Sequence, residues 1–334
     1  MMRRPLLSCL LLAGLLSGMH VAVLADATVG SAPPAAGFPN RAVRIIVNFP
    51  AGGTADVLPR IVSQKLSEKW GQPVIVENRP GAGGNIGAEA VAKSAPDGYT
   101  LLATPPAPLA INQNLYKSLP FAPDRFTPVT ILAAVPNVLA VKSALPVAST
   151  KDFIALARQD QGKVAVATQG NGTTSHLTAA MFATQAGVQF VFVPYKGTAP
   201  ALTDLMGGQV DAFFDNIGSM HNHHKSGKAR ILAVASRKRS PLLPNVPTIS
   251  ETGLPGFDSS TWFAVVAPPG TPPEIAQKIN GAIVEALKLP DVQQKFIELG
   301  AEIVGNSPSD TADFIASERV RWKKVIDTAN VKQE

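Results

Sequence analysis

The sequence predicts an α/β protein of alternating strands and helices, and three observations support that fold class. Short apolar runs typical of buried strands alternate with segments in which apolar residues recur every three or four positions, as in helices. The junctions that lead from strand to helix are rich in Gly, Pro and Thr. The chain has 334 residues, more than one domain usually holds, and the alternation restarts near its middle. We therefore expect two lobes.

The N-terminus has the features of a secretory signal peptide. Arg3 and Arg4 precede an apolar stretch over Leu6–Leu16, and small residues follow it. We expect residues 1–25 to be a cleaved signal peptide. Residues 26–37, rich in Pro, Ala and Gly, should form a disordered lead-in.

Composition excludes several functional classes. The only cysteine, Cys9, lies within the expected signal peptide, so the mature chain has no thiol for catalysis, disulfides or metal binding. The formal net charge of +6 is modest, and no Lys/Arg block of the kind that nucleic-acid binders carry is present. We expect no nucleic-acid partner. No second segment is apolar and long enough to span a membrane, which predicts an exported soluble protein.

The loop Pro50–Thr54 is the first candidate binding element. It follows an apolar strand over Val43–Val47 and precedes a helix whose apolar residues have helical spacing. Gly52 and Gly53 allow close approach of a ligand, and the start of the helix offers free N–H groups to an anion. Thr54 adds a hydroxyl, and Asp56 is placed to cap the helix. The loop matches neither nucleotide-binding glycine motif. Taken alone, it is equally typical of an ordinary strand–helix turn.

The same pattern continues through the first lobe. A second glycine-rich loop spans Asn78–Asn85, and a proline-rich one spans Thr104–Ala107. Each follows a predicted strand, and ligands bind outside the carboxyl ends of parallel strands. We expect these loops to converge with Pro50–Thr54. The strands and helix that separate them are expected over Val74–Val76, Ile86–Lys93 and Tyr99–Ala103.

The second lobe should repeat the opening architecture. Val129–Val141 predicts two short strands, broken at Pro136, that cross between the lobes. A strand over Val164–Thr168 then leads through a Gly/Thr-rich loop, residues 169–176, into a helix over Leu177–Ala186. The remaining elements are expected at Phe153–Arg158, Val188–Val193, Pro200–Met206, Val210–Phe214, Ile231–Ser236 and Trp262–Ala267, with helices after Pro272 that pack on the core.

The chain resembles the Bug, or TctC-type, family, the periplasmic solute-binding receptors of tripartite tricarboxylate transporters. The resemblance runs from about Phe38 to the C-terminus. It rests on several motifs in one order: Arg44–Asp56, Val76–Gly87, Pro96–Leu102, Val193–Gly197, Gly207–Asp211 and Phe214–Asn216.

The resemblance implies a two-lobed periplasmic-binding-protein (Venus flytrap) fold, in which each lobe is a mostly parallel sheet flanked by helices. One lobe would comprise residues 38–140 plus 262–334, and the other residues 141–261. It implies a periplasmic monomer that captures a small carboxylate for the permease subunits of a membrane transporter, with no enzymatic activity, cofactor or metal. In the family, the loops matching Phe49–Asp56 and Gly170–His176 hold a ligand carboxylate, partly through ordered waters.

The expected anion site comprises Gly53, Thr54, Gly172, Thr173 and Thr174 at two helix N-termini that face each other. Thr104–Pro108 departs from the family's usual loop, and its prolines remove N–H donors, so hydrogen bonding to the distal part of the ligand should be poorer there. The full set of expected ligand contacts is Phe49, Pro50, Ala51, Gly52, Gly53, Thr54, Asp56, Asn85, Thr104, Ala107, Gly170, Gly172, Thr173, Thr174, His176, Tyr195, Lys196 and Asp215.

Rival interpretations exist for some of these residues. Ser175, His176 and Asp215 could be imagined as a hydrolase triad, but no G-x-S-x-G motif is present. Asp215 could equally be a solvated turn residue or contact a ligand ammonium or hydroxyl. Lys196 is a cation beside the expected cleft, although exposed lysines are common. A sensor that reports ligand occupancy to a membrane kinase is a third class of function.

A histidine cluster about two thirds of the way along the chain could suggest a metal site. Its members, His221, His223 and His224, match no standard zinc spacing, and no thiol or carboxylate adjoins them. A solvated helix end near Lys225 is the favoured interpretation.

Overall fold

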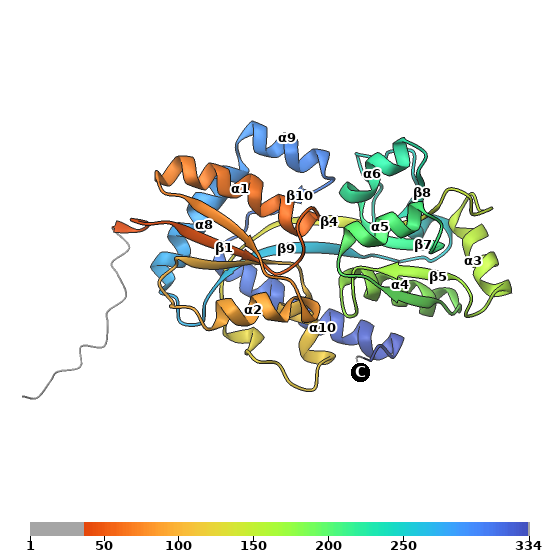
Figure 1. The fold of residues 1–334 in the computed structure, drawn as a ribbon, viewed down its shortest axis with the longest axis horizontal. Helices are drawn as coiled ribbons and strands as arrows, with labels where there is room; N and C mark the ends of the chain where they lie inside the picture. The colour runs from red at the N-terminus through yellow and green to blue at the C-terminus, as the bar shows by residue number, and fades with distance from the viewer. Residues whose placement is uncertain (1–36, 333–334) are drawn as a thin grey trace, which may run out of the picture. The chain divides into compact units, whose positions relative to one another are not determined.

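The computed structural model describes residues 37–332 (Figure 1). The expected signal peptide, residues 1–25, and nearly all of the expected lead-in, residues 26–37, lie outside the described residues. Within the described part, no helix combines the length and the hydrophobicity that crossing a bilayer requires.

The first lobe is organised around a parallel group of strands in the order β2-β1-β3. Side chains of a strand point alternately to its two faces. Ile45 therefore packs against helix α1, and the adjacent Ile46 packs against helix α2 on the opposite face. These elements are β1 (Val43–Val47), α1 (Thr54–Trp70), β2 (Val74–Asn78), α2 (Asn85–Ala92) and β3 (Thr100–Thr104).

The second lobe repeats this plan with the parallel order β7-β5-β6. Phe213 packs toward helix α5, and its neighbour Phe214 packs toward helix α4 on the other face of the sheet. The elements are α3 (Thr150–Gln159), β5 (Ala165–Thr168), α4 (Thr174–Ala186), β6 (Val191–Pro194), α5 (Thr198–Met206), β7 (Ala212–Asn216), α6 (Ile217–Lys225), β8 (Ala229–Val234) and α7 (Ile249–Thr252).

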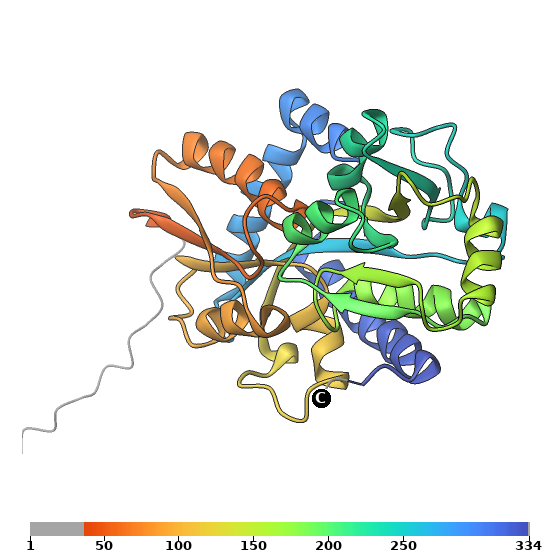
Figure 2. The same cartoon turned by 45° about the vertical axis from the view of Figure 1, so that its right-hand side comes forward.

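Two long strands connect the lobes, β4 (Thr127–Lys142) and β9 (Ser260–Ala267) (Figure 2). Both run antiparallel to their neighbours, so the two sheets are mixed rather than parallel throughout. The two short strands predicted around Pro136 are one continuous strand. Pairing of β4 with β9 ends at Pro136, and pairing with β7 begins at Asn137. Proline has no N–H group to donate to a neighbouring strand. Pro136 is tolerated in β4 because it lies where the strand changes its pairing partner.

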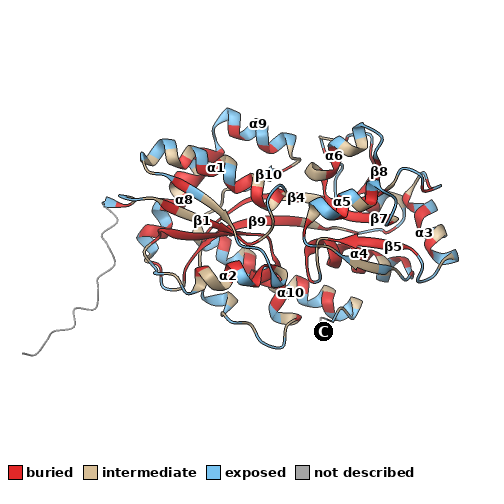
Figure 3. Ribbon diagram, in the orientation of Figure 1, coloured by how far each residue is buried: buried red, intermediate tan, exposed pale blue. Residues whose placement is uncertain are grey.

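The C-terminal helices complete the first lobe and reach the second. Ile315 and Trp322 of α10 share a buried cluster with Leu177 of α4. Figure 3 shows the central strands of both sheets buried and the outer helix faces exposed, whereas the edge strands β2 and β6 are largely not buried. The remaining elements are α8 (Pro273–Leu287), α9 (Pro290–Glu298), β10 (Glu302–Ile303) and α10 (Pro308–Ala329), together with short helical turns between β3 and β4, of which η3 spans Ala107–Ile111.

Candidate functional site

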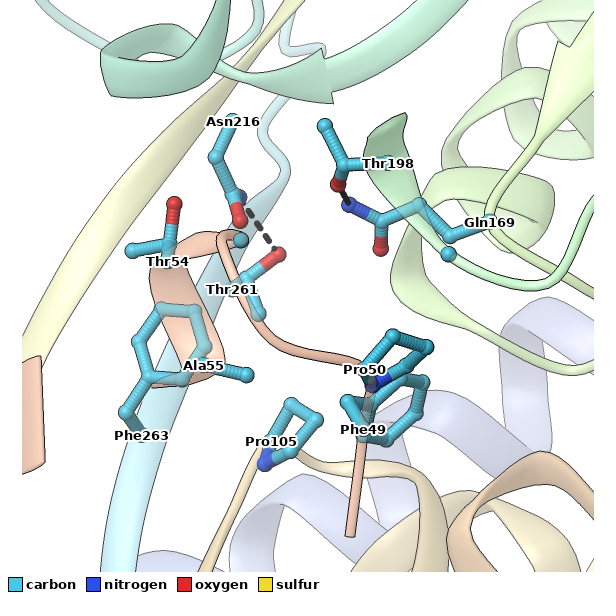
Figure 4. Close-up of a pocket in the computed structure, with 12 residues that line it drawn as sticks. Phe49, Pro50, Thr54, Ala55, Pro105, Gln169, Thr198, Asn216, Thr261 and Phe263 are labelled. Carbon is cyan, nitrogen blue, oxygen red and sulfur yellow. Dashed lines mark hydrogen bonds between the residues drawn. The ribbon is translucent and has the colours of Figure 1, made fainter. Parts of the chain in front are cut away.

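A small cavity lies where the β1–α1 loop of the first lobe meets the carboxyl ends of strands in the second lobe (Figure 4). Its volume is ≈ 30 Å³. Segments distant in sequence contribute to it, as expected for ligand sites at the ends of parallel strands. The lining residues are Phe49, Pro50, Gly53, Thr54, Ala55, Pro105, Gln169, Gly197, Thr198, Asn216, Thr261 and Phe263.

The start of helix α1 presents hydrogen-bond donors to this cavity. Gly53 is the N-cap residue, and its carbonyl accepts the N–H groups of Asp56 and Val57. The N–H groups of Thr54 and Ala55, in the first turn, have no partner within an α-helix. The Thr54 hydroxyl makes no hydrogen bond to any residue that the structure describes, and Thr54 lines the cavity. These groups can donate to an anion.

Asp56 stabilises the loop from behind. Its carboxylate accepts hydrogen bonds from Gly52 N (3.0 Å), Arg60 Nε (2.9 Å) and Asn78 Nδ2 (2.8 Å). Burial raises the pKa of Asp56, but these hydrogen bonds outweigh it and hold the pKa below its ordinary value. The expected capping role is therefore wrong: α1 has no side-chain cap hydrogen bond, and the Asp56 carboxylate instead binds Gly52, which precedes the helix.

A second helix start faces the first across the cavity. Gly197 is the N-cap of α5 and has φ +93°, a conformation that favours glycine. A Cβ atom added to Gly197 would lie 3.1 Å from Pro50 Cγ, and one added to Gly53 would lie 3.6 Å from Thr198 Oγ1. The two loops are thus in direct contact, and two helix N-termini point toward one small space.

Behind this contact lies a network of neutral side chains around a buried carboxyl group. Gln169 Nε2 donates to Thr198 Oγ1 (2.9 Å) and to Asp215 Oδ1 (2.5 Å), and the Thr198 hydroxyl lies 3.5 Å from the same oxygen. Asp215 is fully buried, and its Oδ2 has no hydrogen-bond partner among the described residues. Burial raises the pKa of Asp215 to about 7, and hydrogen bonds offset part of that effect. Asp215 does not line the cavity itself, but it is hydrogen-bonded to Gln169 and Thr198, which do.

The crossing strands supply a third group of polar side chains. Asn216 Nδ2 donates to Thr261 Oγ1 (3.0 Å) and to Asn137 Oδ1 (3.0 Å). The hydroxyls of Thr174 and Thr261 are 2.7 Å apart. Thr174 therefore reaches the cavity through Thr261, not directly.

The structure brings four of the expected contact residues to the cavity: Phe49, Pro50, Gly53 and Thr54. Ala51 and Gly52 are exposed in the same loop. The second helix N-terminus at the cavity is that of α5, whereas the sequence predicts that of α4. The reason is local, because the Thr173 hydroxyl is already used in hydrogen bonds at the start of α4. It donates to Gly170 O and accepts from His176 N.

The loop before α4 is held by His176 in the same way. Gly172 N donates to His176 Nδ1 (3.2 Å), and the imidazole packs edge-on against Phe192. Burial lowers the pKa of His176 to about 4, so the ring is neutral at pH 7. The hydrogen bond and the packing of His176 therefore stabilise the loop before α4.

The other expected contact residues lie away from the lining. Asn85 Oδ1 accepts from Asn112 Nδ2, and the Thr104 hydroxyl donates to Pro105 O. Tyr195 donates to Asp204 Oδ2 (2.6 Å), and burial with this hydrogen bond raises the pKa of Tyr195 to about 12. Ala107 is buried at the start of η3, and Lys196 is exposed.

Sequence reasoning missed several lining residues, above all Gln169, Thr198, Asn216 and Thr261. Weak signals existed. Gln169 begins the Gly/Thr-rich loop, Thr198 follows Gly197 at a helix start, and Asn216 ends a strand. Thr261 had no local signal, because it lies in an apolar strand and reaches the cavity only through the crossing of the lobes.

No catalytic or metal constellation emerges in the described region. Ser175 Oγ donates to Phe214 O, and His176 Nδ1 is occupied by Gly172, so these two side chains are not paired. Within residues 37–332, no group of His, Cys, Asp or Glu could hold a metal ion. The expected helix end is confirmed, because α6 ends at the exposed Lys225, but His221 is buried rather than solvated. His224 Nδ1 accepts from Ile231 N.

Fold and site together define a two-lobed solute-binding protein with a cleft lined by neutral hydrogen-bond donors. The family described as "Tripartite tricarboxylate transporter family receptor" matches residues 58–331, and the chain belongs to this family.

Individual relatives agree with this family. The chain is 41% identical over 310 residues to protein BugT of Bordetella pertussis, covering 92% of this chain and 95% of BugT. The solved structure of R. palustris Rpa4515 with adipate is similar at a TM-score of 0.86 and 40% identity, covering 89% of this chain and 100% of that one. MatC from Rhodopseudomonas palustris with bound malate is similar at a TM-score of 0.82 and 34% identity, with coverages of 86% and 100%. These likenesses confirm the fold class expected from the sequence.

Proposed function

We propose that this protein is a periplasmic receptor that captures a small organic carboxylate between its lobes and delivers it to a tripartite tricarboxylate-type permease. One observation carries the proposal: the N-termini of α1 and α5 point into one cavity, beside the unpaired Thr54 hydroxyl. Two similar proteins, one solved with adipate and one with bound malate, support the same ligand class.

The electrostatics suit a carboxylate. Each helix start carries partial positive charge and free N–H donors, and hydrogen bonds to a charged acceptor are the stronger kind. No lysine or arginine is among the lining residues, so neutral donors supply the recognition. Phe49, Pro105 and Phe263 line the same cavity and provide an apolar surface for the hydrocarbon part of the ligand.

Ligand entry requires the lobes to separate. A cavity of ≈ 30 Å³ has room for about two waters, which is less than a dicarboxylate needs. The contact between Pro50 and Gly197 closes the cavity, and β4 and β9 are the strands about which it would open. We place the moving lobes at residues 38–140 plus 262–334 and 141–261. Compaction on ligand binding, measured by small-angle scattering, tests this motion.

Calorimetric titration of the purified mature protein tests the ligand class. The panel should contain acetate, linear dicarboxylates from malonate to adipate, malate and citrate. We expect at least one of these acids to bind with a stoichiometry of one and to be recovered unchanged. Absence of binding across the panel, or conversion of the acid into a product, would contradict the proposal.

A further inference from the structure

A second and much larger hollow lies at the crossing between the lobes. Its volume is ≈ 870 Å³. The segment Ser236–Leu242, which follows β8, forms one wall, and residues of α9 and β10 form the other. Residues of β4 and β9, among them Pro136 and Ser260, complete it. We call this hollow the crossing groove.

The crossing groove and the carboxylate cavity use opposite faces of the same strand. Ser260 lines the groove, whereas the next residue, Thr261, lines the cavity. Consecutive side chains of a strand point to opposite faces. Pro136, the register partner of Ser260, lines the groove as well. A molecule in the groove would therefore not compete with a ligand in the cavity.

The groove combines positive charge with apolar surface. Arg237, Lys238 and Arg239 are consecutive, exposed, and on its rim. Arg237 pairs with Asp258 at 2.9 Å and Arg239 with Glu251 at 3.0 Å, but both pairs are exposed to solvent and therefore weak.

Lys238 has no ion pair or side-chain hydrogen bond with any residue of the described region. On the opposite wall, Ile297 of α9 is 57% exposed, although it is a large apolar side chain. The lining holds three basic side chains against two carboxylates, Asp258 and Glu302, and so carries a net positive charge beside apolar surface. This combination matches a partner segment that is acidic and carries an apolar side chain.

The groove also depends on the relative position of the lobes. The basic segment follows β8 of the second lobe, whereas Ile297 and Glu302 belong to elements of the first. Closing or opening the lobes would change the distance between the two walls. A partner that binds both walls would distinguish the two states without touching the ligand.

We propose that the crossing groove is a docking site for an acidic, partly apolar segment of the membrane permease. This inference rests on the proposed receptor function, because it names the surface through which the receptor would reach its transporter.

Two substitutions, one on each wall of the groove, distinguish an effect on docking from an effect on ligand capture. The variants are Lys238→Glu and Ile297→Asp. Matched controls are Lys151→Glu, an exposed lysine on α3, and Val320→Asp on α10, a residue that is 73% exposed. All four variants should bind the acid of highest affinity in the titration panel as the wild type does. In cells that rely on this receptor, uptake of that acid should fall at least roughly tenfold for the two groove variants only. Uptake equal to that of the controls would overturn the proposal.

Crosslinking tests docking independently of ligand capture. Cys9 is the chain's only cysteine, so single-cysteine variants can be made in a Cys9→Ser background. Ile297→Cys should crosslink to a permease subunit, identified by mass spectrometry, and Val320→Cys should not. Equal or absent crosslinking to the permease from both positions would overturn the docking site. If no acid binds the wild type, the proposed receptor function fails, and this crosslinking still decides the groove.

Discussion

The side-chain amide of Gln169 donates a hydrogen bond of 2.5 Å to the carboxyl group of Asp215. Gln169 lines the cavity between the lobes, whereas Asp215 is fully buried behind it. The other side chain that hydrogen-bonds this carboxyl group, that of Thr198 in α5, is also neutral. Asp215 is therefore a titratable group with no cation hydrogen-bonded to it, and the Gln169 side chain lies between it and the proposed anion site.

We predict that Asp215→Asn stabilises the protein increasingly as pH rises from about 4 to about 7. Burial raises the pKa of Asp215 to about 7 in the folded state, against an ordinary value of 3.8. Between these values the unfolded chain loses the proton and the folded protein keeps it, so wild-type stability falls as pH rises. Below pH 4 both states are protonated and no penalty applies. Asparagine has no charge to bury.

Thermal unfolding of both proteins across this pH range checks the prediction. The matched control is Asp313→Asn, an exposed residue of α10, for which no pH-dependent gain is expected. A difference between Asp215→Asn and wild type that is constant with pH would contradict a titrating buried carboxyl group.

We also predict that ligand binding at pH 7 takes up protons. A carboxylate beside Gln169 and Thr198 places a like charge near Asp215 and raises its pKa further. Protons should therefore bind with the ligand, and affinity should fall as pH rises above about 7. Titration in phosphate and in Tris should give different apparent enthalpies for the wild type and equal ones for Asp215→Asn. Equal enthalpies for the wild type in both buffers would exclude this coupling.

Thr54→Ala should weaken carboxylate binding without unfolding the protein. The Thr54 hydroxyl faces the cavity, and a hydrogen bond to a charged group contributes about 1.5–3 kcal/mol, or roughly tenfold or more in affinity. Thr174→Ala should cost less, because Thr174 acts through Thr261. Calorimetry measures the affinities, with Thr203→Ala on the exposed face of α5 as the control. Wild-type affinity in a folded Thr54→Ala would place the carboxylate elsewhere.

Gly197→Ala should impair closure of the lobes. Its Cβ would lie 3.1 Å from Pro50 Cγ and would force the two loops apart. Gly208 is a control for a positive φ, which is +76° there, because a Cβ at Gly208 meets open space; Gly197 has in addition a ψ of −172°, a region that is essentially restricted to glycine. Both variants should lose stability, and only Gly197→Ala should lose affinity and compaction in scattering. Equal ligand affinity in the two variants would show that the Pro50–Gly197 contact is not part of closure.

The sequence by itself determined the fold class, most of the elements and one half of the candidate site. Val43–Val47, the glycine-rich turn and the helix after it are local features, because side-chain periodicity and glycine placement are properties of consecutive residues. The position of Gly53 and Thr54 at a strand's carboxyl end follows from the same local pattern.

Tertiary structure alone decided the other half of the candidate site. It selected the start of α5 over that of α4, brought Thr261 to the cavity and buried Asp215 behind Gln169. It also joined two expected strands into β4, with Pro136 at the change of partner. Each of these results depends on which residues face each other across the two lobes. That pairing joins positions far apart in the chain, and no local periodicity encodes it, because it is set by how the two sheets pack and cross.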